Sequence, residues 1–228
     1  MPHVVEPFTN TSFDDALQRL RAAQRYLVSR AKATITASDF DQSCWGTSVK
    51  RSPVALNVGD VPPLIGKADE RLVEVINIAA TVERLIDAIE WFSKQPKNEY
   101  CSIFECHPST SDETNGNDLV IIDSNGQIVA RCEVCDVASS NPGSNNKETK
   151  DIRNLGCDES VPQDGVTRYI CPAPKFANAL AGSERKWDLK PYRYRLIETG
   201  SSSGTCMLLI EPADRDKNEK SPRDAREL

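Results

Sequence analysis

The sequence predicts an α/β protein in which a mixed β-sheet is flanked by helices. Two long segments near the N-terminus, residues 12–33 and 68–93, repeat apolar residues at helical spacing. After Pro96 the pattern changes to short β-rich runs, and two of these are joined by Asn125-Gly126, a strong hairpin signal. Helices and strands in one chain of this length are typical of layered α/β architectures.

The two helices are predicted from their composition as well as their spacing. Ser12, with Asp15 three residues later, resembles a capping box at the start of the first helix. In residues 68–93 the apolar positions keep the helical period, and charged residues fill most of the other positions. We expect the apolar stripes to face the core and the charged faces to meet solvent.

The β-rich part of the chain is centred on a hairpin at residues 117–135. Further short elements are predicted on the same grounds: strands at 54–58, 99–108 and 166–171, a second hairpin from 192–198 and 206–211, and helices at 147–155 and 176–180.

One domain is predicted for residues 1–211, with a helical N-terminal part at 1–95, a core segment at 82–180 and a C-terminal hairpin at 190–211. Residues 212–228 lack apolar periodicity and are predicted to be a disordered, charged tail.

Charge and hydropathy exclude some classes of protein. No apolar run approaches the roughly 18 residues of a membrane helix, and the N-terminus lacks the features of a signal peptide. We therefore expect a cytoplasmic protein without a membrane partner. The net charge of −6 argues against a protein that holds nucleic acid by bulk electrostatics alone. It does not exclude a nuclease, whose metal site is itself acidic.

The chain has eight cysteines, which raises the question of a zinc site. Cys132 and Cys135 form a CxxC pair, with Cys101, Cys106 and His107 upstream. If both cysteines of the pair lie in one strand, they point to opposite faces and cannot bind one ion. Most of the cysteines are interpreted as small buried apolar residues, and a structural-zinc regulatory protein remains a third alternative.

The hairpin also predicts a pair of carboxylates. If Asn125 and Gly126 form a two-residue type I′ turn with positive φ at both positions, Asp118 lies directly opposite Glu133. Side chains at opposite positions share a face, with Cβ atoms about 4.5–5.5 Å apart. A divalent cation such as Mg²⁺, which prefers carboxylate oxygens, would offset their repulsion. A solvated sheet edge, where the repulsion is small, is the simpler alternative.

The order helix, strand, strand, strand, helix, strand resembles the PD-(D/E)XK nuclease superfamily, which has the restriction-endonuclease-like fold. Asn117-Asp118 stands where the motif has Pro-Asp, and Glu133-Val134-Cys135 stands where it has Glu-X-Lys. The resemblance implies a Mg²⁺ site, which Mn²⁺ would also fill, formed by the two carboxylates and the backbone carbonyl of Val134.

The resemblance covers roughly residues 82–180 and lacks the motif lysine. Cys135 occupies that position, and a neutral thiol cannot orient water as an ammonium does. In the superfamily, site residues sometimes move to a neighbouring element, and Lys150 is the first candidate here, with Lys147 second. These two lysines share one face of the predicted helix 147–155, although a solvated helix surface would have the same pattern.

The resemblance implies a Mg²⁺-dependent DNA endonuclease, most simply a type II restriction enzyme that cuts double-stranded DNA. A homodimer is expected, because cutting both strands of a palindrome calls for two-fold symmetry. A nuclease with a repair or phage-defence role is a close alternative. The alternative from another class is a non-catalytic nucleic-acid- or protein-binding module on the same fold, favoured by Cys135 and the acidic charge.

Weaker candidates lie on the neighbouring strands. Glu105 and His107 precede the hairpin, and either side chain would serve the site as an extra acid, base or ligand. Arg193 and Arg195 lie two apart on one strand face and form a candidate phosphate-contacting strip. Each of these patterns also fits an ordinary solvated surface.

Overall fold

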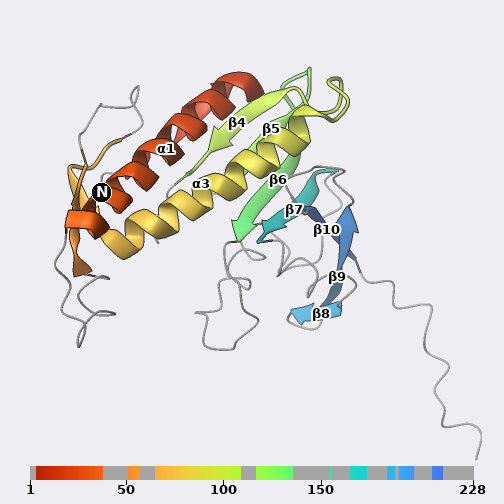
Figure 1. Ribbon diagram of the computed structural model, residues 1–228. Helices are drawn as coiled ribbons and strands as arrows, with labels where there is room; N and C mark the ends of the chain where they lie inside the picture. The colour runs from red at the N-terminus through yellow and green to blue at the C-terminus, as the bar shows by residue number, and fades with distance from the viewer. Residues whose placement is uncertain are drawn as a thin grey trace, which may run out of the picture.

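The computed structural model describes residues 4–37, 51–56, 65–108, 117–135, 155, 165–173, 184–187, 190–197 and 207–212. Its helices are α1 (Phe13–Ala37) and α3 (Leu72–Ser93). Its strands are β1 (Phe8–Thr11), β2 (Pro53–Ala55), β3 (Asp69–Arg71), β4 (Ser102–Cys106), β5 (Leu119–Ile122), β6 (Ile128–Cys135), β7 (Thr167–Pro172), β8 (Glu184–Trp187), β9 (Lys190–Ile197) and β10 (Met207–Pro212). The fold is therefore mixed α/β (Figure 1).

Eight of these strands form one sheet in the order β1-β4-β5-β6-β7-β10-β9-β8, while β2 and β3 pair separately. Neighbouring strands in the large sheet are antiparallel except β6 and β7, which are parallel. Parallel neighbours need a crossover connection of a dozen or more residues, and the chain between Cys135 and Thr167 is long enough for one.

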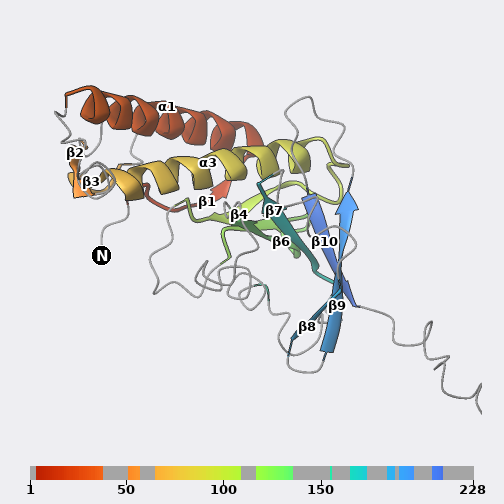
Figure 2. The same ribbon diagram turned by 60° about the horizontal axis from the view of Figure 1, so that its bottom comes forward.

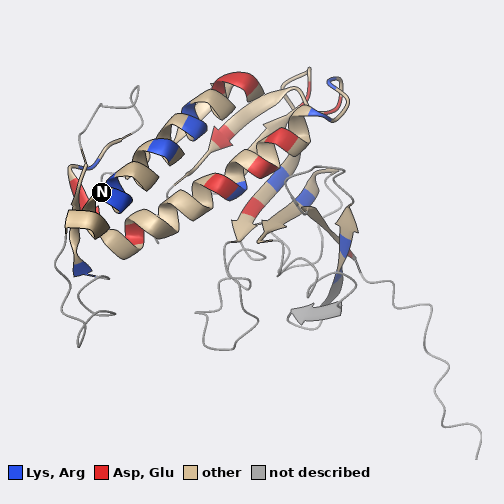
Figure 3. Ribbon diagram, viewed as in Figure 1, with Lys and Arg blue, Asp and Glu red and all other residues tan. Residues whose placement is uncertain are grey.

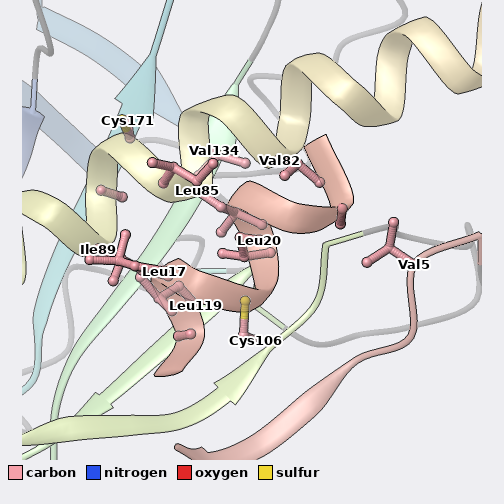
Figure 4. Packing of buried hydrophobic residues seen from close by; sticks show 14 of the residues in the cluster. Val5, Leu17, Leu20, Val82, Leu85, Ile89, Cys106, Leu119, Val134 and Cys171 are labelled. Atoms are coloured by element: carbon pink, nitrogen blue, oxygen red, sulfur yellow. The ribbon is translucent and has the colours of Figure 1, made fainter. Parts of the chain in front are cut away.

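The two helices lie side by side on one face of the sheet (Figure 2). Arg21 of α1 forms a 2.6 Å ion pair with Glu90 of α3, so the start of one helix lies beside the end of the other. Their apolar stripes pack on the sheet, and residues such as Leu20, Leu85 and Leu119 meet in one core (Figure 4).

The structure confirms the first helix and corrects the start of the second. The Oγ of Ser12 accepts a hydrogen bond from the Asp15 N–H and donates to the Asp15 carboxylate, which is the expected cap. The second helix was expected from residue 68 but begins at Leu72, because Asp69–Arg71 pairs with Pro53–Ala55 as β3. A long-range strand pairing thus overrides the local helical pattern.

The strand predictions are mostly confirmed. The runs at 99–108, 117–135 and 166–171 contain β4, the β5–β6 hairpin and β7, and the second hairpin is β9–β10. The run at 54–58 is described only in part, as β2. Strands β1 and β8 were not predicted. The predicted helix 176–180 and the predicted tail beyond Pro212 lie outside the described residues.

Each central strand has two chemically different faces. In β6, Ala130, Cys132 and Val134 belong to the core beneath the helices, so the alternate residues point to the opposite side. We call that opposite side the far face. Ile170 of β7 and Leu208 of β10 are buried there, with 1% and 0% exposure, so the sheet is covered on both sides. Glu133 therefore lies in an enclosed setting.

Candidate functional site

The β5–β6 turn differs from the predicted one. Its loop has three residues, Ser124 to Gly126, because Asp123 donates its N–H to the carbonyl of Gln127 and accepts from the N–H of Gly126. Only Gly126 in this loop has a positive φ, at 77°. The type I′ turn with Asn125 in the same conformation was therefore wrong, and a type I turn followed by a left-handed glycine takes its place.

A second irregularity restores the predicted register. The longer loop shifts the pairing by one residue at Ile122 and Ile128, and a bulge at Val129 shifts it back. Leu119 then pairs with Cys132, as the sequence predicted. Asp118 and Glu133 occupy the next position outward along the two strands.

Asp118 and Glu133 form the centre of the candidate site. Both lie on the far face, since Leu119 and Cys132 beside them belong to the core beneath the helices. Each is only 2% exposed, so the solvated sheet edge considered above is excluded. Two carboxylates buried together need strong compensation, because an isolated buried charge is costly and like charges repel.

The backbone of β6 supplies part of this compensation. The N–H of Val134 donates to Oδ2 of Asp118 at 2.8 Å. In an antiparallel pair, the N–H and C=O of one residue point toward the same neighbouring strand. The carbonyl of Val134 therefore points toward the side on which the Asp118 carboxylate lies, as the predicted metal ligand set requires.

Side chains of Asn117, just before β5, and Arg131 of β6 also help to offset the burial of the carboxyl groups. The amide of Asn117 donates from Nδ2 to Oε1 of Glu133 at 3.1 Å. Its Oδ1 accepts a 2.7 Å hydrogen bond from Nη1 of Arg131. Asn117 is 2% exposed, so this Arg131–Asn117–Glu133 chain holds the Glu133 carboxylate in one orientation within the protein.

Glu105 and His107 also lie on the far face, on β4 and just after it. The N–H of His107 donates to the carbonyl of Asp118 at 2.9 Å, so His107, Asp118 and Glu133 form a row across three strands. Nε2 of His107 lies 3.6 Å from Oε2 of Glu105. The structure thus brings together these two weaker candidates and the carboxylate pair.

Cys135 lies on the far face two residues beyond Glu133, is 1% exposed and is paired with Pro172 of β7. Cys132 faces the helices instead, which confirms that the CxxC pair is split between the two faces. Burial raises the pKa of the Cys106 and Cys132 thiols, which disfavours the thiolates that zinc requires. Among the described residues there is no group of three or more His, Cys, Asp or Glu side chains placed to hold a metal.

The two candidate lysines, Lys147 and Lys150, lie outside the described residues, as does most of the predicted helix 147–155. Its last residue, Leu155, is described and buried. The carbonyl of Leu155 accepts a 2.7 Å hydrogen bond from Nε of Arg168, whose side chain projects from the far face of β7. Leu155, which belongs to the connection between β6 and β7, therefore lies on the far face.

The candidate phosphate-contacting strip on β9 is paired within the protein. Arg193 and Arg195 both contact the Glu211 carboxylate, with shortest distances of 3.2 and 2.7 Å. Both arginines are about half exposed, so these are surface ion pairs of small energetic weight. This strip is not part of the far-face group around Asp118.

The roles of two residues on the far face were not predicted. Asn117 donates a hydrogen bond to Glu133, and Arg131 donates one to Asn117. The signal for Arg131 was present in the sequence, because a residue two before Glu133 on one strand shares its face. The role of Asn117 depends on its side-chain direction just before β5, which no sequence pattern specifies.

Comparison of the chain with family models, curated proteins and solved structures finds no match. Within the described part of the chain, neither helix has the length and apolar character needed to cross a membrane. The far face thus carries the buried carboxyl groups of Asp118 and Glu133, with Arg131, His107 and Cys135 on the same face. Any function assigned to this face must use these groups.

Proposed function

We propose that the protein is a Mg²⁺-dependent DNA endonuclease of the type II restriction class. The observation that supports this most is the buried pair Asp118 and Glu133, which project from adjacent strands onto one face. A pair of buried carboxylates is an unfavourable arrangement for stability alone, which favours a functional reason for it.

The arrangement of elements also supports the proposal. The described order α3, β4, β5, β6, β7 matches the superfamily order of a helix and three strands before a fourth strand. The predicted second helix would belong to the connection between β6 and β7, which passes the far face at Leu155. The restriction-endonuclease-like fold is therefore proposed together with the activity.

The donor atoms fit Mg²⁺. Asp118 and Glu133 provide carboxylate oxygens, and the carbonyl of Val134 faces the same side, so hard oxygen ligands come from two strands. Mg²⁺ keeps several waters and uses one or two carboxylates, so a third acidic side chain is not required. When bound, it supplies charge neutralisation at the phosphate and a water of lowered pKa.

The residues of the chain itself would orient substrate and water around this site. Asn117 and Arg131 hold Glu133, while the backbone of Val134 holds Asp118. We propose Lys150, and after it Lys147, as the cation that orients the attacking water. Lys150 is five residues before Leu155 in the sequence, and a chain of five residues spans at most about 18 Å.

The proposed substrate is double-stranded DNA, and the proposed assembly is a homodimer. A direct test compares cleavage of plasmid DNA in Mg²⁺ or Mn²⁺ by the unaltered protein, Asp118→Asn and Glu133→Gln. Glu83→Gln is the matched control, because Glu83 is an exposed acid on α3. We expect the unaltered protein and the control to cut DNA in a metal-dependent way. Either site substitution should lower the cleavage rate by about 100-fold or more.

A non-catalytic binding module on the same fold is the second candidate, and Cys135 favours it. Its thiol is buried at the position of the motif lysine, where it cannot orient water. DNA binding without cleavage in either metal would establish this function and reject the nuclease. Cleavage that survives both carboxylate substitutions would reject the proposed site.

A further inference from the structure

We infer that Arg131 binds a phosphate of the DNA backbone beside the Asp118–Glu133 pair, an inference that rests on the proposed function. Arg131 lies two residues before Glu133 on β6, so both side chains project from the far face. The hydrogen bond from its Nη1 to Asn117 directs the guanidinium toward the carboxylate end of the strand. Asn117 directly precedes Asp118, which places a positive charge next to the carboxylate pair.

The guanidinium of Arg131 is available for a ligand. In the described part of the chain it forms no ion pair, and its side-chain hydrogen bond goes to a neutral amide, that of Asn117. A guanidinium has five N–H donors, and this contact uses one nitrogen. The side chain is partly exposed, unlike that of Arg168, which is 3% exposed and donates to backbone carbonyls.

The chemistry of the site favours a phosphate as that ligand. A planar guanidinium matches the oxygens of a phosphate and is always protonated, so it neutralises charge without exchanging a proton. Arg131 would supply, on the strand that carries Glu133, positive charge that the thiol of Cys135 cannot supply. It leaves the orientation of water to another residue, such as Lys150.

A simpler role for Arg131 is to neutralise the two buried carboxylates and nothing else. The two roles differ in their response to salt. A protein cation that contacts a phosphate releases counter-ions from DNA, which steepens the salt dependence of binding. An arginine that acts only inside the protein leaves that slope unchanged when it is replaced.

The test measures binding of a fluorescent DNA duplex at several salt concentrations, with Ca²⁺ in place of Mg²⁺ to prevent cleavage. Arg131→Gln is compared with Arg131→Lys and with Arg25→Gln, an exposed arginine on α1. We expect Arg131→Gln to weaken binding by about 10-fold and to reduce the magnitude of the log–log salt slope by about 0.9. Arg131→Lys keeps the slope because it keeps the charge, and Arg25→Gln changes neither quantity.

A second measurement uses the unaltered protein and so does not depend on the folding of a variant. Phenylglyoxal modification, followed by mass spectrometry, is expected to be slowed at Arg131 by the duplex and to be unaffected at Arg25. An unchanged rate at Arg131, or an Arg131→Gln slope equal to that of the unaltered protein, overturns this inference and leaves the proposed nuclease standing. An unaltered protein that neither binds nor cuts DNA overturns both.

Discussion

Asn117 connects the Arg131 guanidinium to the Glu133 carboxyl group through its neutral amide. Neither aspartate nor alanine can form both of these hydrogen bonds. Oδ1 accepts from Arg131 and Nδ2 donates to Glu133, so both ends of the amide are used in the direction that their charges require. The residue is also 2% exposed, which prevents water from replacing it easily.

Replacing Asn117 by alanine is expected to lower the free energy of unfolding by about 1–3 kcal/mol, because the buried Glu133 carboxyl group and the partly exposed Arg131 guanidinium lose this partner. Asn117→Asp keeps an acceptor for Arg131 but places a second acidic group against Glu133, so it should also destabilise the protein. Urea unfolding at pH 7 measures these effects. Asn98→Ala, at an exposed turn, is the control. Equal stability of all three variants at pH 7 would show that the bridge contributes nothing.

The β5–β6 turn is stabilised by its own side chain. Asp123 accepts hydrogen bonds from the N–H groups of Gln127 and Asn125, each at 2.8 Å. The N–H of Gln127 is the main cause of a lowered pKa for the Asp123 carboxyl, with further lowering from Asn125 and Gly126. The charged carboxylate is thus favoured by the folded turn.

A lowered pKa has a defined sign for stability. The contribution of Asp123 is fully present above its unfolded pKa, near 3.9, and is lost as the pH falls through the lower pKa of the folded protein. Asp123→Asn keeps an acceptor oxygen but cannot titrate. Melting temperatures between pH 6 and the acid limit should therefore fall more for the unaltered protein than for the variant. Parallel pH profiles for the two proteins would contradict this.

In the whole molecule, the candidate site and the helix pair lie on opposite faces of the sheet. Lys and Arg predominate along α1, whereas Asp and Glu predominate along α3 (Figure 3). The Arg21–Glu90 pair joins these two surfaces. The helices therefore do not line the far face, so DNA bound at Asp118 would be contacted by other parts of the protein.

The proposed water-orienting cation, Lys150, lies 17 residues after Glu133 in the chain. Lys150→Ala is expected to lower the rate of metal-dependent cleavage by about 100-fold or more, and Lys147→Ala by less. Plasmid cleavage under single-turnover conditions measures both rates, and duplex binding in Ca²⁺ should be nearly the same for the two variants. Equal rates for Lys150→Ala and the unaltered protein would assign the role elsewhere, with His107 beside Asp118 as the next residue to replace.

Sequence patterns predicted the elements that depend on local periodicity. Both helices and the two hairpins follow from spacing and turn residues, whereas the register of Asp118 opposite Glu133 is as predicted only because the bulge at Val129 offsets the longer loop. Features that depend on distant partners were missed. Strand β1 becomes a strand by pairing with β4, and the start of α3 is set by the pairing of β3 with β2. The turn type was wrong because Asp123 side-chain hydrogen bonds favour the three-residue loop.

The bulge at Val129 lies between the turn and the candidate site, so the effect of a deletion depends on where it falls. Removing Val129 would make the pairing regular and leave Leu119 opposite Cys132. Removing one loop residue would shorten the turn to two residues without changing the strand pairs beyond it. Removing Arg131 would instead turn Glu133 toward the helices. Changes in the length of this segment during evolution or engineering should therefore be tolerated in the loop and at the bulge, but not between the bulge and Glu133.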